Sequence, residues 1–238
     1  MWLWIIATFS AFFIKGLCGF ANTLIFSSIM AFNANNINIS PVELLLGYPA
    51  NITLVLKNRK SLKKSVFIPL TILVLLGCIP GALLLKNVNV RFIKLLFGAV
   101  VILIAIELLL RELNVIKLKT SKLVLGIIGL LSGVLCGLFG IGAPLAAYVS
   151  RVTASEAEFK ANISAVFISE NTFRIILYSV IGIITLPVLK QALLLIPVMA
   201  AGLLLGMLCS KLFKDRVIKI LIVILLIISG IVMIIRNI

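Results

Sequence analysis

Long apolar segments separated by short polar stretches run along almost the whole chain. A helix needs about 20 apolar residues to cross a bilayer, and segments of this length recur throughout the sequence. The pattern therefore predicts an all-α polytopic membrane protein with about eight transmembrane helices, at 2–32, 42–56, 66–85, 92–110, 123–142, 161–185, 191–210 and 217–235.

Four short motifs occur twice in the same order, at offsets of 121, 113, 111 and 125 residues. They are Gly16-Leu-Cys-Gly19 with Gly137-Leu-Phe-Gly140, Ser40-x-x-Glu43 with Thr153-x-x-Glu156, Ala50-Asn51-Ile52-Thr53 with Ala161-Asn162-Ile163-Ser164, and Arg91-x-x-Lys94 with Arg216-x-x-Lys219. The matches predict one integral membrane domain, 1–238, made of two tandem repeats of about four helices, 1–112 and 121–238. Secondary transporters are often built from such duplicated halves.

The orientation of the two repeats depends on how often each crosses the membrane. Four crossings per repeat make the halves parallel, which is the arrangement we expect. The glycine motifs, however, lie in apolar stretches that exceed one crossing but fall short of two. If one of them is re-entrant, the number of crossings becomes odd and the halves are inverted.

Charge is scarce and mostly basic: 63% of the residues are hydrophobic, 12% are charged, and the net charge is +15. The basic residues collect in short loops, as the positive-inside rule requires, so we expect contact with the lipid bilayer and not with nucleic acid. Loops 57–64 and 111–122 are then cytoplasmic, with 86–91 outside. Lys211, Lys214 and Arg216 are also expected outside. The N-terminal apolar run is expected to stay as the first span, since no basic region precedes it.

Several kinds of enzyme are excluded by composition. The sequence has no histidine, a single aspartate at Asp215, and no phosphate-binding loop of the G-x-x-x-x-G-K-[ST] type. Its four cysteines, Cys18, Cys78, Cys136 and Cys209, are scattered through apolar context and form no C-x-x-C pair. We therefore expect no enzymatic activity, no resident metal and no cofactor.

The glycine motifs are the first candidate for a binding site. A break in a helix at membrane depth persists only where the backbone is buried or lines a cavity, and amides freed there can bind an anion. Gly19, Gly140 and Gly142 are thus candidates for lining a substrate site. Close helix packing is the alternative role for these glycines.

Two pairs of polar motifs follow the glycine segments. Ser40-Pro-Val-Glu43 and Thr153-Ala-Ser-Glu156 are typical of capping boxes, so we expect them to mark helix starts. Asn51 and Asn162 then lie inside those helices, where an amide in lipid must face the protein interior or water. They are candidates for substrate contact, with interhelical hydrogen bonding as the alternative.

Charged residues deep in apolar segments are the strongest anomaly. Glu170 and Arg174 lie in the middle of a predicted span and are four residues apart, so they can pair on one helix face. A charge at the bilayer centre costs about 2.5–3.5 kcal/mol on insertion scales, so it needs a reason. Arg174 is a candidate counter-ion for an anionic substrate and Glu170 a candidate coupling carboxylate. A self-neutralised structural pair is the alternative. Lys15 either reaches the membrane interface or lines the same cavity, and Asn22 is a further candidate for the lining.

At these glycine motifs the chain resembles the TauE/SafE family of sulfite and organosulfonate exporters. Gly19-Phe20 and Gly140-Ile141-Gly142 stand where that family carries its glycine clusters, and Lys160-Ala-Asn-Ile-Ser164 resembles the segment that follows the second cluster. The resemblance covers nearly the whole chain. It implies a plasma-membrane permease for small sulfur-containing anions, driven by an ion gradient. The chain departs from the pattern at Ala21-Asn22 and Ala143-Pro144.

Two other classes remain open at this stage. The chain could be a membrane scaffold or partner subunit that transports nothing, or a passive anion channel with no coupling group. Residues alone also leave open whether copies of the chain form a homo-oligomer.

Overall fold

The computed structural model describes residues 1–30, 39–84, 122–139 and 143–235, together with eight single positions between 95 and 110. The described residues form helices and no β-strand, so the prediction of an all-α fold is confirmed. The predicted loop 86–91 and most of the predicted span 92–110 lie outside this part of the chain. The elements are α1 (Trp2–Cys18), α2 (Asn22–Met30), α3 (Ile39–Lys57), the 3₁₀ helix η1 (Arg59–Ser61), α4 (Lys64–Leu84), α6 (Lys122–Phe139), α7 (Ala143–Val152), α8 (Glu156–Val180), α9 (Leu186–Ser210) and α10 (Asp215–Ile235).

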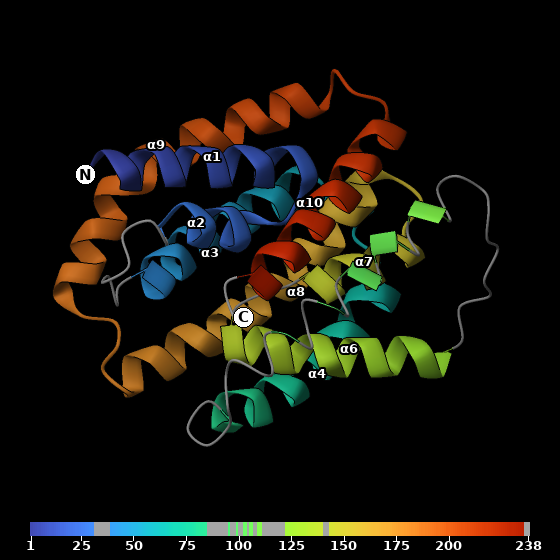
Figure 1. The fold of residues 1–238 in the computed structure, drawn as a ribbon, viewed down its shortest axis with the longest axis horizontal. Helices are drawn as coiled ribbons and strands as arrows, with labels where there is room; N and C mark the ends of the chain where they lie inside the picture. The colour runs from blue at the N-terminus through green and yellow to red at the C-terminus, as the bar shows by residue number, and fades with distance from the viewer. Residues whose placement is uncertain are drawn as a thin grey trace.

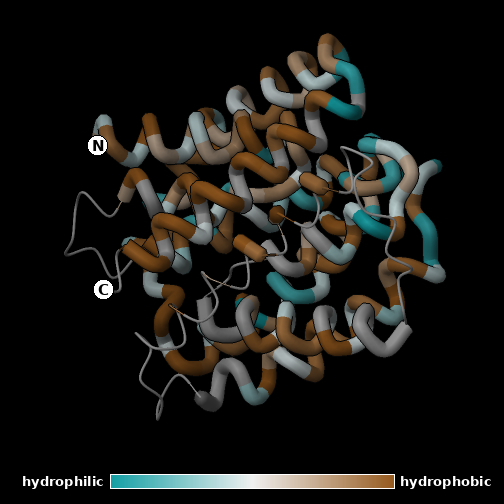
Figure 2. The backbone as a smooth tube through the Cα atoms, turned by 45° about the vertical axis from the view of Figure 1, so that its right-hand side comes forward, coloured by the Kyte–Doolittle hydropathy of each residue, from teal (hydrophilic) through white to brown (hydrophobic). Residues whose placement is uncertain are grey.

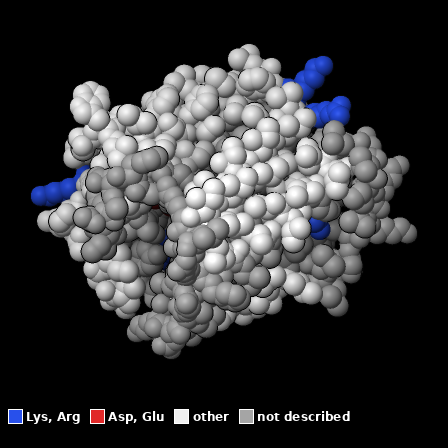
Figure 3. Space-filling view, in the orientation of Figure 1, with Lys and Arg blue, Asp and Glu red and all other residues white. Residues whose placement is uncertain are grey.

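The surface of the bundle is suited to lipid. Three of the described helices, α3, α8 and α9, are long and apolar enough to cross a membrane, and α1 is a shorter apolar helix. Hydrophobic positions dominate along the helices in Figure 2, and hydrophilic ones gather at the right-hand side of that view. In Figure 3 the blue basic side chains stand towards the two ends, and the described surface between them is almost free of charge. The count of eight spans stays a prediction.

Two closely packed helix pairs flank the centre of the bundle. α1 lies against α9 along one edge and α4 lies against α6 along the other, while α3 and α8 pack on each other between them (Figure 1). Small residues allow both close approaches: Gly16, Gly202 and Gly206 lie between α1 and α9, and Gly77, Gly129 and Gly133 lie between α4 and α6.

α9 bends before it reaches α1. Figure 1 shows its first part along the left edge and its second part running beside α1. Pro197 lies inside this helix. Proline lacks an amide hydrogen and clashes with the preceding turn, which accounts for the bend.

The first apolar stretch, 2–32, holds one helix and a short return. Gly19 and Ala21 both have positive φ, of 88° and 72°, and they end α1 and reverse the chain. The nine-residue α2 then folds back along α1, so that the rings of Trp4 and Phe26 lie 5.8 Å apart. This path fits the re-entrant alternative that the sequence left open, and no membrane boundary is needed to see the reversal itself.

Helices α3 and α8 run in opposite directions. Ser40, at the start of α3, lies beside Arg174 near the end of α8, and Tyr48 lies beside Thr172. Lys63, beyond the end of α3, pairs with Glu158 at the start of α8. If α3 and α8 are matching helices of two repeats, this direction fits the inverted alternative better than the parallel arrangement that we expected, and the two repeats themselves stay a prediction. The reason lies in the path between the two helices. The three spans expected at 66–85, 92–110 and 123–142 would place the end of α3 and the start of α8 at opposite ends, but the two lie at the same end.

The two described basic loops lie at one end of the bundle. Lys57 and Lys211 line the same pocket, although the second was expected on the opposite side of the membrane from the first. The expectation that the loop of Lys211, Lys214 and Arg216 lies opposite loop 57–64 is therefore wrong, because it assumed three crossings between α3 and α8, and the end of α3 and the start of α8 lie at the same end. We call the end formed by residues 57–64 and 211–216 the basic end. The positive-inside rule predicts that this end faces the cytoplasm.

Candidate functional site

A polar cavity lies where α1, α2, α3 and α8 meet, and we call it the central cavity. The space between the atoms there is about 410 Å³, a figure that includes solvent open to the outside. Each of the four helices contributes polar side chains: Lys15 from α1, Asn22 and Thr23 from α2, Glu43 and Asn51 from α3, and Glu170, Asn171 and Arg174 from α8. All of these except Thr23 are buried. In a chain with so few charges, their meeting defines the candidate site.

One side of the cavity is a chain of hydrogen bonds that starts at Lys15. The Lys15 ammonium donates to Asn22 Oδ1 at 2.8 Å and lies 5.4 Å from the centre of the Phe167 ring. Asn22 Nδ2 donates in turn to Glu43 Oε1, and Thr23 Oγ1 donates to the same oxygen at 3.0 Å. Lys15 is only 1% exposed, so it lines the cavity and does not extend to the membrane interface.

Arg174 occupies the other side of the cavity. Its guanidinium lies 3.5 Å from Glu170 Oε1 and donates to Ser40 Oγ and Tyr178 Oη, each at 3.2 Å. It also lies 5.3 Å from the centre of the Tyr178 ring. The Glu170 contact is long for a charge-assisted hydrogen bond, which is usually about 2.7–2.9 Å, so the two charges are near but not tightly engaged.

Two buried polar atoms at this site have no hydrogen-bond partner among the residues that the structure describes. These are Arg174 Nε, a donor, and Asn51 Oδ1, an acceptor. Buried polar groups in folded proteins are almost always hydrogen-bonded, so such exceptions call for a reason. A bound solute or water in the central cavity would supply the missing contacts.

The start of α2 also faces the cavity. Residues Phe20 to Leu24, which include the reversal and the first turn of α2, belong to its lining. A helix N-terminus carries unpaired amides and a partial positive charge, so it favours an anion. Two cationic side chains and this helix end therefore converge on one space.

The central cavity also holds two carboxylates. If Lys15, Arg174, Glu43 and Glu170 are all ionised, their formal charges sum to zero. An added anion is then attracted by the cations and repelled by the carboxylates. Neutralising one carboxylate with a proton leaves a net positive site, so anion binding and proton binding are coupled by elementary electrostatics.

The structure brings together five of the residues that the sequence singled out. Lys15, Asn22, Asn51, Glu170 and Arg174 all line the central cavity. Gly19 ends α1 beside this cavity, and its amide donates to Lys15 O at 2.6 Å. Gly140 and Gly142 lie outside the described residues.

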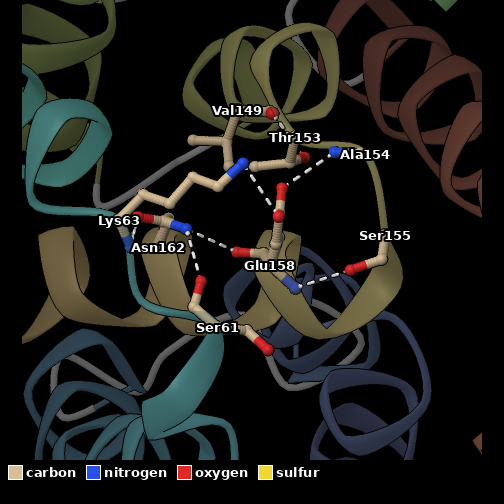
Figure 4. A network of polar contacts seen from close by, with 8 residues as sticks. All are labelled: Ser61, Lys63, Val149, Thr153, Ala154, Ser155, Glu158 and Asn162. Carbon is tan, nitrogen blue, oxygen red and sulfur yellow. Dashed lines mark hydrogen bonds and ion pairs between the residues drawn. The ribbon is translucent and has the colours of Figure 1, made fainter.

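Asn162 is not part of the central cavity. It lies near the start of α8, where its side chain accepts from the Lys63 amide at 3.1 Å and donates to Glu158 O at 2.7 Å (Figure 4). These bonds connect the start of α8 to the segment between α3 and α4, which is a structural contact close to the interhelical alternative. Because α3 and α8 are antiparallel, the residue that matches Asn51 in sequence comes to lie at a different depth.

The first predicted capping box is wrong. α3 begins at Ile39, so Ser40 is inside the helix and its hydroxyl accepts from Arg174. Glu43 accepts from Asn22 and Thr23 in the central cavity. Sequence reasoning therefore missed Glu43 as a site residue. Its position was a signal, because it is the only acidic residue before Glu107.

The second predicted capping box is displaced by two residues. Ser155 is the N-cap of α8 and accepts from the Glu158 amide at 3.2 Å, while Glu158 accepts from the Ala154 amide at 3.0 Å (Figure 4). Thr153 donates to Val149 O, and Glu156 pairs with Lys160. A helix start was predicted correctly here, but the wrong residues were assigned to it.

The strained reversal leads to a prediction about stability. Ala21 has a left-handed backbone, which costs an L-residue about 1–2 kcal/mol, so Ala21→Gly is expected to stabilise the fold by about 1 kcal/mol after the entropy of the glycine is counted. Gly19→Ala is expected to act in the opposite direction, since its Cβ would lie 2.8 Å from Lys160 Cγ. Thermal unfolding of the purified variants measures both changes, and a lower midpoint for Ala21→Gly than for wild type would contradict the assignment of strain.

Comparison with known proteins identifies the class of the chain. The sulfite exporter TauE/SafE family matches residues 4–233, which is nearly the whole sequence. The chain belongs to this family, whose members are membrane transporters. No curated protein and no solved structure gives a match.

Proposed function

We propose that the chain is a secondary permease that carries small anions, such as sulfite or a sulfonate, across the plasma membrane. Membership of a transporter family supports transport. The observation that carries the proposal is the buried central cavity, in which two cations and a helix N-terminus face one space between the helices. Charges are costly at this depth and are typical of substrate pathways.

In this proposal the anion binds between Lys15 and Arg174. The guanidinium offers its unpartnered Nε, and the first turn of α2 offers backbone amides. Asn51 also lines the cavity, and in this proposal it orients the solute through its amide. A planar guanidinium suits an oxyanion because it presents parallel donors.

Glu170 is the coupling carboxylate of this proposal. When it is ionised it competes with the substrate for Arg174, from which it is separated by 3.5 Å. A proton on Glu170 removes that competitor and makes the cavity net positive. The anion and a proton then bind together, so a proton gradient can drive the anion.

Alternating access is proposed to come from two inverted halves. In chain order, α1 corresponds to α6, α3 to α8 and α4 to α9. Under this correspondence the packed pair of α1 and α9 becomes the packed pair of α6 and α4. The antiparallel contact between α3 and α8 lies on the axis of that exchange. Inverted halves of this kind can rock about a central site.

Asn51→Leu tests the proposal without altering charge. The substitution keeps the side-chain volume similar but removes the amide from the cavity, so sulfite flux into proteoliposomes is expected to fall about tenfold or more. Thr53→Leu is the matched control: it lies two residues away on α3, is exposed, and hydrogen-bonds only to the carbonyl of Pro49 among the contacts described. Its flux is expected to equal that of wild type.

The outcomes separate the classes of protein left open by the sequence. A scaffold gives no flux in wild type and tolerates Asn51→Leu. A passive channel gives flux that an imposed proton gradient does not change. Equal flux in wild type and Asn51→Leu would remove the central cavity from the transport path.

A further inference from the structure

A second pocket lies at the basic end of the bundle, where α3 ends, α8 begins and α9 ends. The space between its atoms is about 420 Å³, including solvent open to the outside. The polar residues that line it include three lysines and a single carboxylate, so its ionised side chains sum to +2: Lys57, Lys160, Lys211 and Glu156, with Asn58 and Ser210. Nothing in the transport mechanism described above uses this pocket.

Lys160 forms the inner wall of the pocket. Its side chain is only 3% exposed, unlike those of Lys57 and Lys211, which are exposed. The ammonium donates to the backbone carbonyl of Gly16 at 2.7 Å and pairs with Glu156. A buried ammonium held by a neutral carbonyl and one carboxylate still has donor capacity for an arriving oxyanion.

Gly19 makes room for this side chain. A Cβ at Gly19 would lie 2.8 Å from Lys160 Cγ and 3.5 Å from the ring of Phe159. The glycine that reverses the chain after α1 thus also lets Lys160 cross to the last turn of α1. Gly19 and Lys160 thus lie in contact, although about 140 residues separate them in the sequence.

The last turn of α1 separates the pocket from the central cavity. Gly16, which holds Lys160, directly follows Lys15, whose side chain lines the central cavity. Phe20 and Ala21, just after Gly19, line the central cavity as well. The backbone at the end of α1 therefore has two faces. Lys160 contacts one of them, and the other faces the central cavity.

We propose that the basic pocket is a second binding site for small oxyanions on the transport path, and that Lys160 controls passage from it to the central cavity. This inference rests on the proposed function of the central cavity. An oxyanion attracted by Lys57 and Lys211 binds the Lys160 ammonium in place of Glu156. Once the ammonium leaves the carbonyl of Gly16, the contact that ties α8 to the end of α1 is released.

The test counts sulfite ions bound to the full-length protein in a detergent free of anionic lipid. Calorimetry on wild type is expected to show two sites per chain. Lys57→Gln/Lys211→Gln removes two exposed charges without disturbing a buried group, and it is expected to weaken the second site about tenfold and to flatten its salt dependence. Lys190→Gln, an exposed lysine of α9 far along the helix from Ser210, is the matched control and is expected to keep both sites.

Lys160→Met tests the passage itself. Sulfite is expected still to bind in the central cavity, but the dependence of flux on Lys57 and Lys211 is expected to disappear. If Lys160→Met unfolds, Lys160→Arg replaces it, because arginine keeps the charge and alters the contact with Gly16. Unchanged flux and unchanged dependence in the folded variant would overturn the role of Lys160.

The outcomes also separate this inference from the proposed function. One sulfite site in wild type, or two unaltered sites in Lys57→Gln/Lys211→Gln, overturns the second site and leaves the central cavity intact. The central site is tested separately by Glu170→Gln/Arg174→Gln, which is expected to lose sulfite binding in the central cavity. If phosphatidylglycerol stabilises wild type but not the double variant while sulfite occupies one site, the pocket binds a lipid phosphate and the inference is wrong.

Discussion

Replacing Glu170 and Arg174 together by glutamine is expected to abolish anion transport while leaving the protein folded. Removing Arg174 alone would leave the buried Glu170 unpaired, which costs about 3–5 kcal/mol and confuses loss of binding with loss of structure. The double variant removes both charges, so the net charge of the central cavity is unchanged. Loss of the guanidinium is expected to reduce sulfite flux in proteoliposomes about 100-fold or more.

Glu170→Gln alone is the matched control for this prediction. It keeps Arg174 with its contacts to Ser40 and Tyr178 and removes only the competing carboxylate. In wild type, sulfite binding is expected to tighten as pH falls, because a proton on Glu170 releases the guanidinium. In Glu170→Gln binding is expected to persist without that dependence. Wild-type flux in the double variant would show that Arg174 is not the counter-ion.

The helical class and the location of the central cavity were accessible from sequence because charge is so scarce. A polar side chain in an apolar chain has few places to go, since lipid penalises it on every outer face. Lys15, Asn22, Asn51, Glu170 and Arg174 could thus be predicted to share one interior space. Their hydrogen-bond partners could not, because the rotation of each helix about its axis is set by packing.

Glu43 was missed because one local pattern had two explanations. Ser40-Pro-Val-Glu43 matches a capping box, in which the glutamate bonds to the backbone three residues before it. That interpretation gives Glu43 a partner and leaves no reason to place it in a binding site. The actual helix begins one residue earlier, and the reversed α2 brings Asn22 and Thr23 to the carboxylate. Only the tertiary path of residues 19–30 reveals this role.

Helix direction explains the other errors. A sequence motif fixes what a residue is but not the depth at which it lies, and antiparallel helices place matching motifs at different depths. Asn51 lines the central cavity, whereas Asn162 joins Ser61, Lys63 and Glu158 near the basic end (Figure 4). The same reversal moves Lys211 to the side of Lys57. Both errors follow from expecting three crossings between α3 and α8, whereas the end of α3 and the start of α8 lie at the same end of the bundle.

Gly206→Val is expected to destroy the packing of α1 on α9 and with it the fold. A Cβ at Gly206 would lie 2.9 Å from the backbone nitrogen of Leu17 and 2.9 Å from the carbonyl carbon of Phe13. Backbone atoms cannot move aside as a flexible side chain does, so the two helices must separate. The expected loss of stability is about 3 kcal/mol or more. Monodisperse yield and thermal unfolding in detergent measure it.

Gly126→Ala is the control that separates close packing of two helices from the general effect of replacing a glycine. Apart from the backbone of α6 itself, no atom of the described residues lies within 4 Å of the position that a Cβ would take at Gly126, although this glycine also lies inside an apolar helix. Alanine is the better helix former by about 1 kcal/mol, so this variant is expected to be as stable as wild type or more so. Gly133→Val, in the other close pair, should behave like Gly206→Val, because its Cβ would lie 2.9 Å from Gly77 Cα. A Gly206→Val protein with wild-type stability would mean that α1 and α9 are not in this contact, and the central cavity that α1 helps to form would lose its support.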